Sequence, residues 1–201
     1  MSYNPDLHHR RSHRLAGYDY SQSGAYFMTI CTNNRECLFG DIVMGQMVLN
    51  AVGQIVADEW AKTAAMRPLI ESDEWVVMPN HFHAIVFIKN DTATSVGARR
   101  AVPSSKTSTE YKNTAPYMPD RGPTEAFGCP VPGSLSTIVR SFKSAVTKQV
   151  NLLRQTPGLV LWQRNFWDHV IRNEVDCNRI REYIHTNPQR WQMDSLHQDS
   201  N

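Results

Sequence analysis

The chain has 201 residues, 41% of them hydrophobic and 20% charged, and a formal net charge of +2. That length fits one decorated domain or two small ones. No apolar run approaches the ~20 residues that a membrane span needs, and the N-terminus lacks the apolar core of a signal peptide. The four cysteines form no Cys-x-x-Cys pair, which argues against a disulfide framework or a zinc knot and favours a reducing compartment. We therefore expect a cytoplasmic protein that does not enter a membrane.

Positive charge gathers in the C-terminal part of the chain. From Arg140 to Arg190 there are nine Lys and Arg residues and four Asp and Glu residues, a net of +5 that leaves −3 for the rest. Three more arginines stand near the N-terminus, at Arg10, Arg11 and Arg14. Such clusters suit a polyanion, because each neutralised phosphate releases counterions. Ordinary solvated charge is the alternative, and charge alone does not decide between the two.

The first half of the chain predicts an arm, a strand, a helix and a hairpin, in that order. Residues 1–24 are polar and basic, which indicates an N-terminal arm. Residues 25–32 are rich in β-forming side chains and predict a strand, whereas residues 46–65 carry apolar side chains at helical spacing. Residues 74–88 read as a hairpin. Its second strand, from residue 82 onwards, is apolar on both faces, so we expect it at the centre of its sheet.

The second half predicts an insertion followed by helices and short strands. Residues 90–133 are rich in Ser, Thr, Pro and Gly and lack a periodic apolar pattern, so we expect a flexible insertion. Helical periodicity resumes over residues 134–154. Residues 159–163 and 168–172 are short strand candidates, and a last helix is expected over residues 174–187.

The ends of the last predicted helix are marked by two residues. Asn173 is a suitable N-cap, and Pro188 disfavours helical geometry at the residue before it. Together these elements predict one folded domain over residues 25–192, interrupted by the insertion, with a C-terminal tail at residues 193–201.

His81-Phe82-His83 is the most informative motif of the chain. Alternate side chains of a strand share a face, so the two imidazoles point the same way, roughly 6.6–7 Å apart along the chain, while Phe82 points to the other face. Two neutral imidazoles at this spacing can bind one divalent metal ion. The alternative is a pair of histidines whose ring nitrogens are satisfied by hydrogen bonds within the sheet.

The last predicted helix offers the rest of a site. Ile180, Tyr183, Ile184 and Asn187 follow the i, i+3, i+4, i+7 spacing and share one face. If this face docks on the histidine face of the sheet, two imidazoles, an amide oxygen and a phenol come together. A metal polarises a phosphoryl oxygen and tyrosine forms covalent intermediates, so the cluster predicts phosphodiester transesterification through a phosphotyrosine. The alternatives are that Tyr183 is an ordinary core tyrosine and that Asn187 only caps the helix.

The sequence resembles a known family in two motifs. The run Met-Pro-Asn-His-Phe-His ending at His83, and the run Arg-Glu-Tyr-Ile-His-Thr-Asn-Pro from Arg181 to Pro188, are similar to motifs of the single-tyrosine HUH (His-hydrophobic-His) transposases. The resemblance is strongest to the REP-associated tyrosine transposases of bacteria, and it covers about residues 10–89 and 134–192. Further similar segments are residues 17–20, 27–32, 136–144 and 162–169.

The resemblance implies a fold, an activity and a role for each site residue. The implied fold is α+β, a ferredoxin- or RRM-like antiparallel sheet with helices packed on it, and the implied activity is Mg²⁺- or Mn²⁺-dependent cleavage and joining of single-stranded DNA. His81 and His83 correspond to metal ligands and Asn187 to the third ligand, where the wider family often has a longer glutamine. Tyr183 corresponds to the nucleophile, which stays attached to the 5′ side and leaves a 3′-hydroxyl. Because the family recognises short palindromes that fold as hairpins, we expect hairpin DNA as partner and a nucleoid-associated location in a bacterium.

Six basic residues are the candidates for contacts to this DNA. They are Arg10, Arg11 and Arg14 in the arm, and Arg140, Lys143 and Arg164 in the C-terminal part. His169 and His185 are expected to be structural or to face the DNA. The aromatic stretch at residues 162–167 is expected in the core, although one of its rings could stack on an unpaired base.

Two other functions are compatible with these patterns. The first is a non-catalytic, RRM-like nucleic-acid-binding protein, although paired histidines facing Tyr183 and Asn187 serve no purpose in stacking bases. The second is a metal hydrolase in which water attacks directly and Tyr183 only positions the phosphate. A monomer is favoured over a homodimer if the helix that carries Tyr183 docks on its own sheet.

Overall fold

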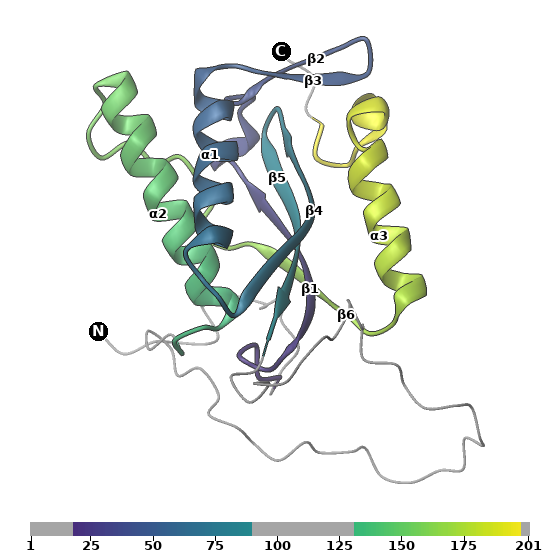
Figure 1. Ribbon diagram of the computed structural model, residues 1–201. Coiled ribbons are helices and arrows are strands. Elements are labelled where there is room, and N and C mark those ends of the chain that lie inside the picture. The colour runs from purple at the N-terminus through teal and green to yellow at the C-terminus, as the bar shows by residue number, and fades with distance from the viewer. Residues whose placement is uncertain (1–17, 90–130, 198–201) are drawn as a thin grey trace, which may run out of the picture.

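The computed structural model describes residues 18–89 and 131–197, and these form one four-stranded sheet with helices on both of its faces (Figure 1). The sheet order is β4-β5-β1-β6, and all neighbouring strands are antiparallel. The strands are β1 (Gly24–Cys31), β4 (Ile70–Met78), β5 (His81–Ile88) and β6 (Trp167–Ile171). In the sequence, α1 (Ala51–Ala65) lies between β1 and β4, and α2 (Leu135–Arg154) between β5 and β6. This β-α-β-β-α-β order confirms the predicted α+β, ferredoxin-like fold and the central position of β5.

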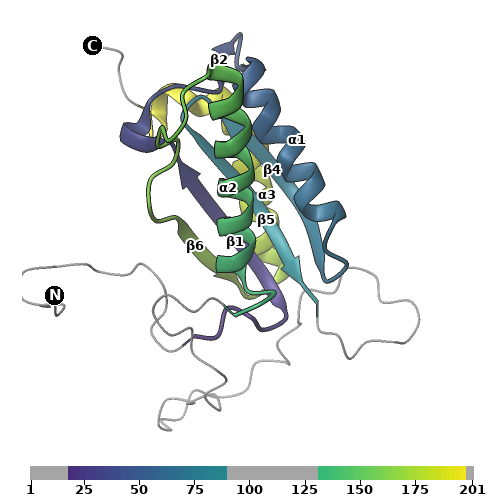
Figure 2. The same cartoon turned by 90° about the vertical axis from the view of Figure 1, so that its left-hand side faces the viewer.

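Helices α1 and α2 cover one face of the sheet, and α3 (Glu174–Thr186) covers the other. Figure 2 shows α1 and α2 side by side in front of the strands, and Figure 1 shows α3 on the opposite side. The larger core lies beneath α1 and α2, where Trp60, Phe82 and Phe142 are buried with ring centroids 5.1–5.3 Å apart. This apolar layer anchors the sheet from one side and leaves the α3 side to carry polar groups.

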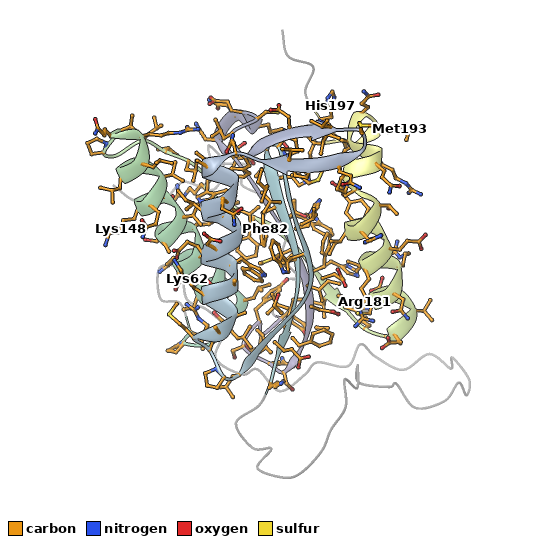
Figure 3. The ribbon with its side chains drawn as sticks, turned by 45° about the horizontal axis from the view of Figure 1, so that its top comes forward. Lys62, Phe82, Lys148, Arg181, Met193 and His197 are labelled. Carbon is orange, nitrogen blue, oxygen red and sulfur yellow. The ribbon has the colours of Figure 1, made fainter. Side chains whose placement is uncertain are left out.

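A small apolar cluster and an ion pair hold α3 on the sheet. Ile180 and Ile184 of α3 belong to the same buried cluster as Phe27 of β1. Arg181, which Figure 3 labels beside α3, pairs with Asp73 of β4 at 2.6 Å. Because the Asp73 carboxylate is only 6% exposed, this contact fixes where α3 lies along the sheet.

A short hairpin of β2 (Gly40–Val43) and β3 (Gln46–Leu49) precedes α1. The helix predicted over residues 46–65 is wrong for its first residues, which form β3. Met44 and Gly45 both have positive φ, at 51° and 75°, as two-residue hairpin turns require. The helix starts only after Asn50, whose side-chain oxygen accepts hydrogen bonds from the backbone N–H groups of Val52 and Gly53 in α1.

Three further expectations differ from the structure. Residues 159–163 are not a strand, and only Trp162 forms an isolated bridge, with Thr32. The helical periodicity of residues 134–154 predicts Leu153 on the apolar stripe of this helix, but its side chain is 52% exposed. Tyr20, in the segment expected to be a polar arm, is buried in the main core.

Some expectations fall where the structure gives no description. Residues 90–130 of the predicted insertion and residues 1–17 of the predicted arm lie outside the described residues. Within the described ranges, no helix has both the length and the apolar character to cross a membrane.

Candidate metal and nucleophile site

The two histidines of β5 lie on the α3 face of the sheet, as the strand alternation predicts. His81 and His83 are 0% and 2% exposed, and their ring centroids are 4.4 Å apart. They stand opposite Cys31 and Thr29 of β1 in the antiparallel register. A rigid central strand therefore presents both imidazoles in a buried position.

Asn80 determines which nitrogen of His81 faces the site. The Nδ2 of Asn80 donates to the backbone carbonyls of Arg35 and Leu196, at 3.0 and 2.8 Å. Its Oδ1 is thereby turned towards His81 and accepts from Nδ1 at 2.8 Å. The Nε2 of His81 then carries the free lone pair, which is the arrangement that metal-binding histidines adopt with a hydrogen-bonded partner behind them.

His83 is oriented in the same way by β1 and contacts the candidate nucleophile. Its Nδ1 is 2.8 Å from Oγ1 of Thr29. Its Nε2 lies 3.3 Å from the hydroxyl oxygen of Tyr183, which comes from α3. The predicted docking of the tyrosine helix on the histidine face is therefore present in the structure.

Asn187 and Asp194 complete the cluster at the C-terminal end of α3. Asn187 is 2% exposed, and its Nδ2 donates to Oδ2 of Asp194 at 2.9 Å. The backbone N–H of Leu196 donates to the other carboxylate oxygen at 2.7 Å. One nitrogen from each of His81 and His83 and one carboxylate oxygen of Asp194 all lie within 4.8 Å of one another. These residues could hold a metal ion.

Two buried polar atoms indicate that a cation fits here. Nε2 of His81 and Oδ1 of Asn187 have no hydrogen-bond partner within the part of the chain that the structure describes. Buried polar atoms are normally paired, and both of these atoms are lone-pair donors. Two imidazoles, an amide oxygen and a carboxylate form a donor set that divalent ions such as Mg²⁺ and Mn²⁺ accept, with positions left for substrate oxygens.

The site electrostatics keep the imidazoles neutral and the phenol protonated. Burial lowers the pKa of His81 to about 4, although the Asp194 carboxylate opposes the shift. Burial, followed by the charge of His81, holds the pKa of His83 well below its usual value. Burial and the negative charge of Asp194 raise the pKa of Tyr183 to about 12. Neutral imidazole is the form that binds metal, so the histidines need no deprotonation at neutral pH.

A groove of about 540 Å³ opens beside Tyr183, between α3 and the β1–β6 side of the sheet. Tyr183 itself is 38% exposed, so its hydroxyl lies between the buried polar cluster and the solvent. Nine residues line the groove: Phe27, Trp167, His169, Arg179, Ile180, Glu182, Tyr183, Thr186 and Arg190. The aromatic rings and arginines that line the groove suit a single nucleic-acid strand, because bases stack on aromatic rings and positive charge binds the backbone.

The predicted basic contacts lie elsewhere or outside the described residues. Arg10, Arg11 and Arg14 lie in the part of the chain that is not described. Arg140 is exposed on α2, on the opposite side of the sheet from Tyr183, and Arg164 is exposed in the segment before β6. The Nζ of Lys143 donates to the backbone carbonyls of residues 163, 164 and 165, at 2.5, 3.3 and 3.3 Å. A DNA contact for each of the six residues stays a prediction.

Sequence reasoning missed Asp194 and the role of Asn80. Asp194 follows the 3-10 helix η2 (Pro188–Met193), in a stretch assigned to the tail, and no spacing rule connects it to the histidines. The hairpin predicted over residues 74–88 places Asn80 at its turn and gives it no part in the site. The position of Asn80 directly before His81 was the signal available, because an amide next to a histidine can fix the imidazole tautomer.

Comparison with known proteins identifies a relative and a fold. An uncharacterized protein of Haemophilus influenzae is 36% identical over 197 residues, which cover 98% of each chain. The chain belongs to the same family as this protein. No family model matches the chain.

Among solved structures, the chain is similar to a REP-associated tyrosine transposase bound to a REP hairpin. The TM-score is 0.50 at 23% identity, over 85% of this chain and 70% of that one. This chain has the fold of a REP-associated tyrosine transposase. The resemblance predicted from the sequence motifs is thus confirmed at the level of the fold.

Proposed function

We propose that this chain is a transposase-like, metal-dependent endonuclease and strand transferase that acts on single-stranded hairpin DNA through Tyr183. The observation that carries the proposal is the placement of the Tyr183 hydroxyl 3.3 Å from Nε2 of His83, beside the unpartnered Nε2 of His81 and Oδ1 of Asn187 within the described residues. The fold likeness to a transposase with a bound DNA hairpin supports the same conclusion.

Tyr183 would act as the nucleophile in a balanced exchange of phosphodiester bonds. Its phenolic oxygen bonds to phosphorus while the bond from phosphorus to the 3′ oxygen breaks. The phenol gives up one proton and the departing 3′ oxygen takes one up, which leaves a 3′-hydroxyl and a 5′-phosphotyrosine. Because the number of phosphoester bonds is unchanged, attack by a 3′-hydroxyl reverses the step and joins strands.

The buried cluster would hold the metal ion on which this step depends. His81, His83 and Asp194 supply two nitrogens and a carboxylate oxygen, and Asn187 supplies an amide oxygen. When bound, Mg²⁺ or Mn²⁺ polarises a phosphoryl oxygen and stabilises the negative charge of the transition state. The raised pKa of Tyr183 means that the phenol needs nearby positive charge to react, because an opposite charge favours the ionised form.

A denaturing gel tests the proposal. Labelled single-stranded hairpins, taken from palindromes of the genome that encodes the chain, are incubated with the protein in Mg²⁺ or in EDTA. We expect a protein–DNA adduct that needs Mg²⁺ and survives denaturation, and we expect Tyr183→Phe to abolish both adduct and cleavage while hairpin binding persists. Tyr18→Phe is the matched control: it removes a hydroxyl in the segment before β1 that lies 3.5 Å from the hydroxyl of Tyr26, in the main core, and it should leave the adduct unchanged.

The other outcomes of this gel favour the alternative functions. Mg²⁺-dependent cleavage without an adduct in the wild-type protein would favour a hydrolase in which water attacks. Hairpin binding with neither cleavage nor adduct would favour an RRM-like binding protein. An adduct that persists in Tyr183→Phe would overturn the assignment of the nucleophile.

A further inference from the structure

Trp167 is an exposed aromatic side chain placed beside the candidate nucleophile. It lies on edge strand β6 and is 43% exposed. The antiparallel register puts Trp167 opposite Thr29, which in turn stands opposite His83. Two strand spacings therefore separate Trp167 from His83 on the same face, roughly 10 Å between their Cα atoms. Both Trp167 and Tyr183 line the same groove.

The ring of Trp167 rests on a fixed support. The imidazole of His169 lies parallel to the indole, with an interplanar angle of 4° and centroids 6.2 Å apart. Nε2 of His169 is held by Asp176 at 2.8 Å, and the same carboxylate binds Arg179 at 2.8 Å. Phe27 contacts the indole edge-on, at 5.6 Å between centroids. The indole is therefore oriented by Phe27 on one strand and by His169 on its own strand.

The charges of the groove suit a nucleic-acid backbone at one side of this ring. Arg179 and Arg190 both line the groove and are exposed. Glu182 lines the groove too, and its negative charge disfavours a phosphate nearby. We therefore expect the contacts to the DNA backbone to come from the two arginines. A flat, supported ring with guanidinium groups beside it is the combination that binds unpaired bases with little sequence preference.

We propose that Trp167 stacks on an unpaired base of the single-stranded segment next to the phosphate that Tyr183 attacks, with Arg179 and Arg190 flanking the backbone. The inference rests on the proposed function, because it names the part of that same substrate which the groove holds. It assigns Trp167 a positioning role: the stack sets which phosphate of the strand lies at the tyrosine.

Binding measurements that need no chemistry test the stack. The probe is a fluorescent DNA hairpin with short single-stranded arms, titrated in EDTA with Tyr183→Phe protein so that neither metal nor cleavage contributes. Adding Trp167→Ala should weaken binding about tenfold, which is within the range of one base–aromatic stack. Trp167→Phe should restore most of the affinity, and Trp167→Leu should not, because leucine is apolar without an aromatic face.

Trp75→Ala is the matched control. Trp75 is also an exposed tryptophan of an edge strand, 38% exposed on β4, but its ring packs towards Phe82 on the α1 side of the sheet. Its loss should leave the affinity for the hairpin unchanged. Equal effects of Trp75→Ala and Trp167→Ala would overturn the proposal.

Abasic substitutions locate the stacked base. Removing one base at a time from the arms should weaken binding to the parent protein at one position, and that loss should vanish in Trp167→Ala. Independent, additive losses at every position, or unchanged affinity in Trp167→Ala, would overturn the inference. If binding depends on Trp167 but the wild-type protein forms no adduct, the proposed function is wrong and the stacking role of Trp167 is supported. If the adduct forms but Trp167→Ala binds DNA like its parent, the stacking role is wrong and the proposed function is supported.

Discussion

Two asparagines illustrate how single residues set the chemistry of this site. Asn80 uses both N–H groups on backbone carbonyls and thereby aims its oxygen at His81. Asn187 uses its N–H group on Asp194 and leaves its oxygen without a partner within the described residues. In both cases the amide is fixed by a neighbour: Asn80 leaves the lone pair on Nε2 of His81, and Asn187 keeps the lone pair of its own Oδ1. Metal affinity should therefore depend on residues that do not touch the metal as well as on its ligands.

Asp194→Asn should weaken Mn²⁺ binding to the protein by about tenfold or more, in the range that loss of a metal-site residue typically costs. The change keeps the size of the side chain but removes the charge that lies within 4.8 Å of the histidine nitrogens. Isothermal titration calorimetry with Mn²⁺ measures the effect. Glu182→Gln removes a carboxylate from the nearby groove and should leave Mn²⁺ affinity unchanged. Wild-type affinity in Asp194→Asn would contradict a role for Asp194 in the metal site.

At the scale of elements, the sequence predicts correctly the helices and strands whose limits are set by neighbouring residues. The prediction of helix α3 was correct because Asn173 caps the helix and because its apolar residues follow a regular helical spacing. The β5 histidines were placed correctly because strand alternation needs no knowledge of partners. The β2–β3 hairpin was missed because its turn needs a positive φ at Met44, and methionine is not a residue type that indicates such a turn. Asp194 was missed because tertiary contacts bring its segment back to the site, those of Asn187 with Asp194 and of Asn80 with Leu196, and no local pattern encodes them.

Lys143 shows how one side chain ties two elements together. Its ammonium, on α2, donates to three consecutive backbone carbonyls of the segment that leads into β6, and burial lowers its pKa to about 8. Lys143→Met should lower the free energy of unfolding by about 1–3 kcal/mol, because three backbone carbonyls lose a charged donor. Urea denaturation measures this against Lys148→Met, an exposed lysine of the same helix that Figure 3 labels.

Equal unfolding free energies of these two variants would show that the hydrogen bonds of Lys143 to residues 163–165 do not stabilise the fold. The same pair also separates the predicted DNA contact of Lys143 from its structural role. If Lys143 contacts phosphate, folded Lys143→Met should bind hairpin DNA more weakly than Lys148→Met does.

For the whole molecule, the candidate nucleophile lies on α3 and the histidines lie on β5, and both elements belong to the same chain. Helix α3 is held on the sheet by the Arg181–Asp73 ion pair and by Ile180 and Ile184. A site assembled within one chain predicts a working monomer. Equimolar mixing of His81→Ala with Tyr183→Phe should then give no more adduct than either variant alone. Restored adduct formation in the mixture would indicate instead that two chains exchange their tyrosine helices.

The residue to which DNA becomes attached is the most direct test of the proposed role of Tyr183. The measurement is peptide mapping by mass spectrometry of the adduct formed with a hairpin in Mg²⁺, after nuclease digestion of the DNA. We predict a nucleotide mass on the peptide that contains Tyr183, with the phosphate on its phenolic oxygen. A nucleotide on any other residue, or unmodified Tyr183 in protein that has cleaved its substrate, would contradict the role of Tyr183 as the nucleophile.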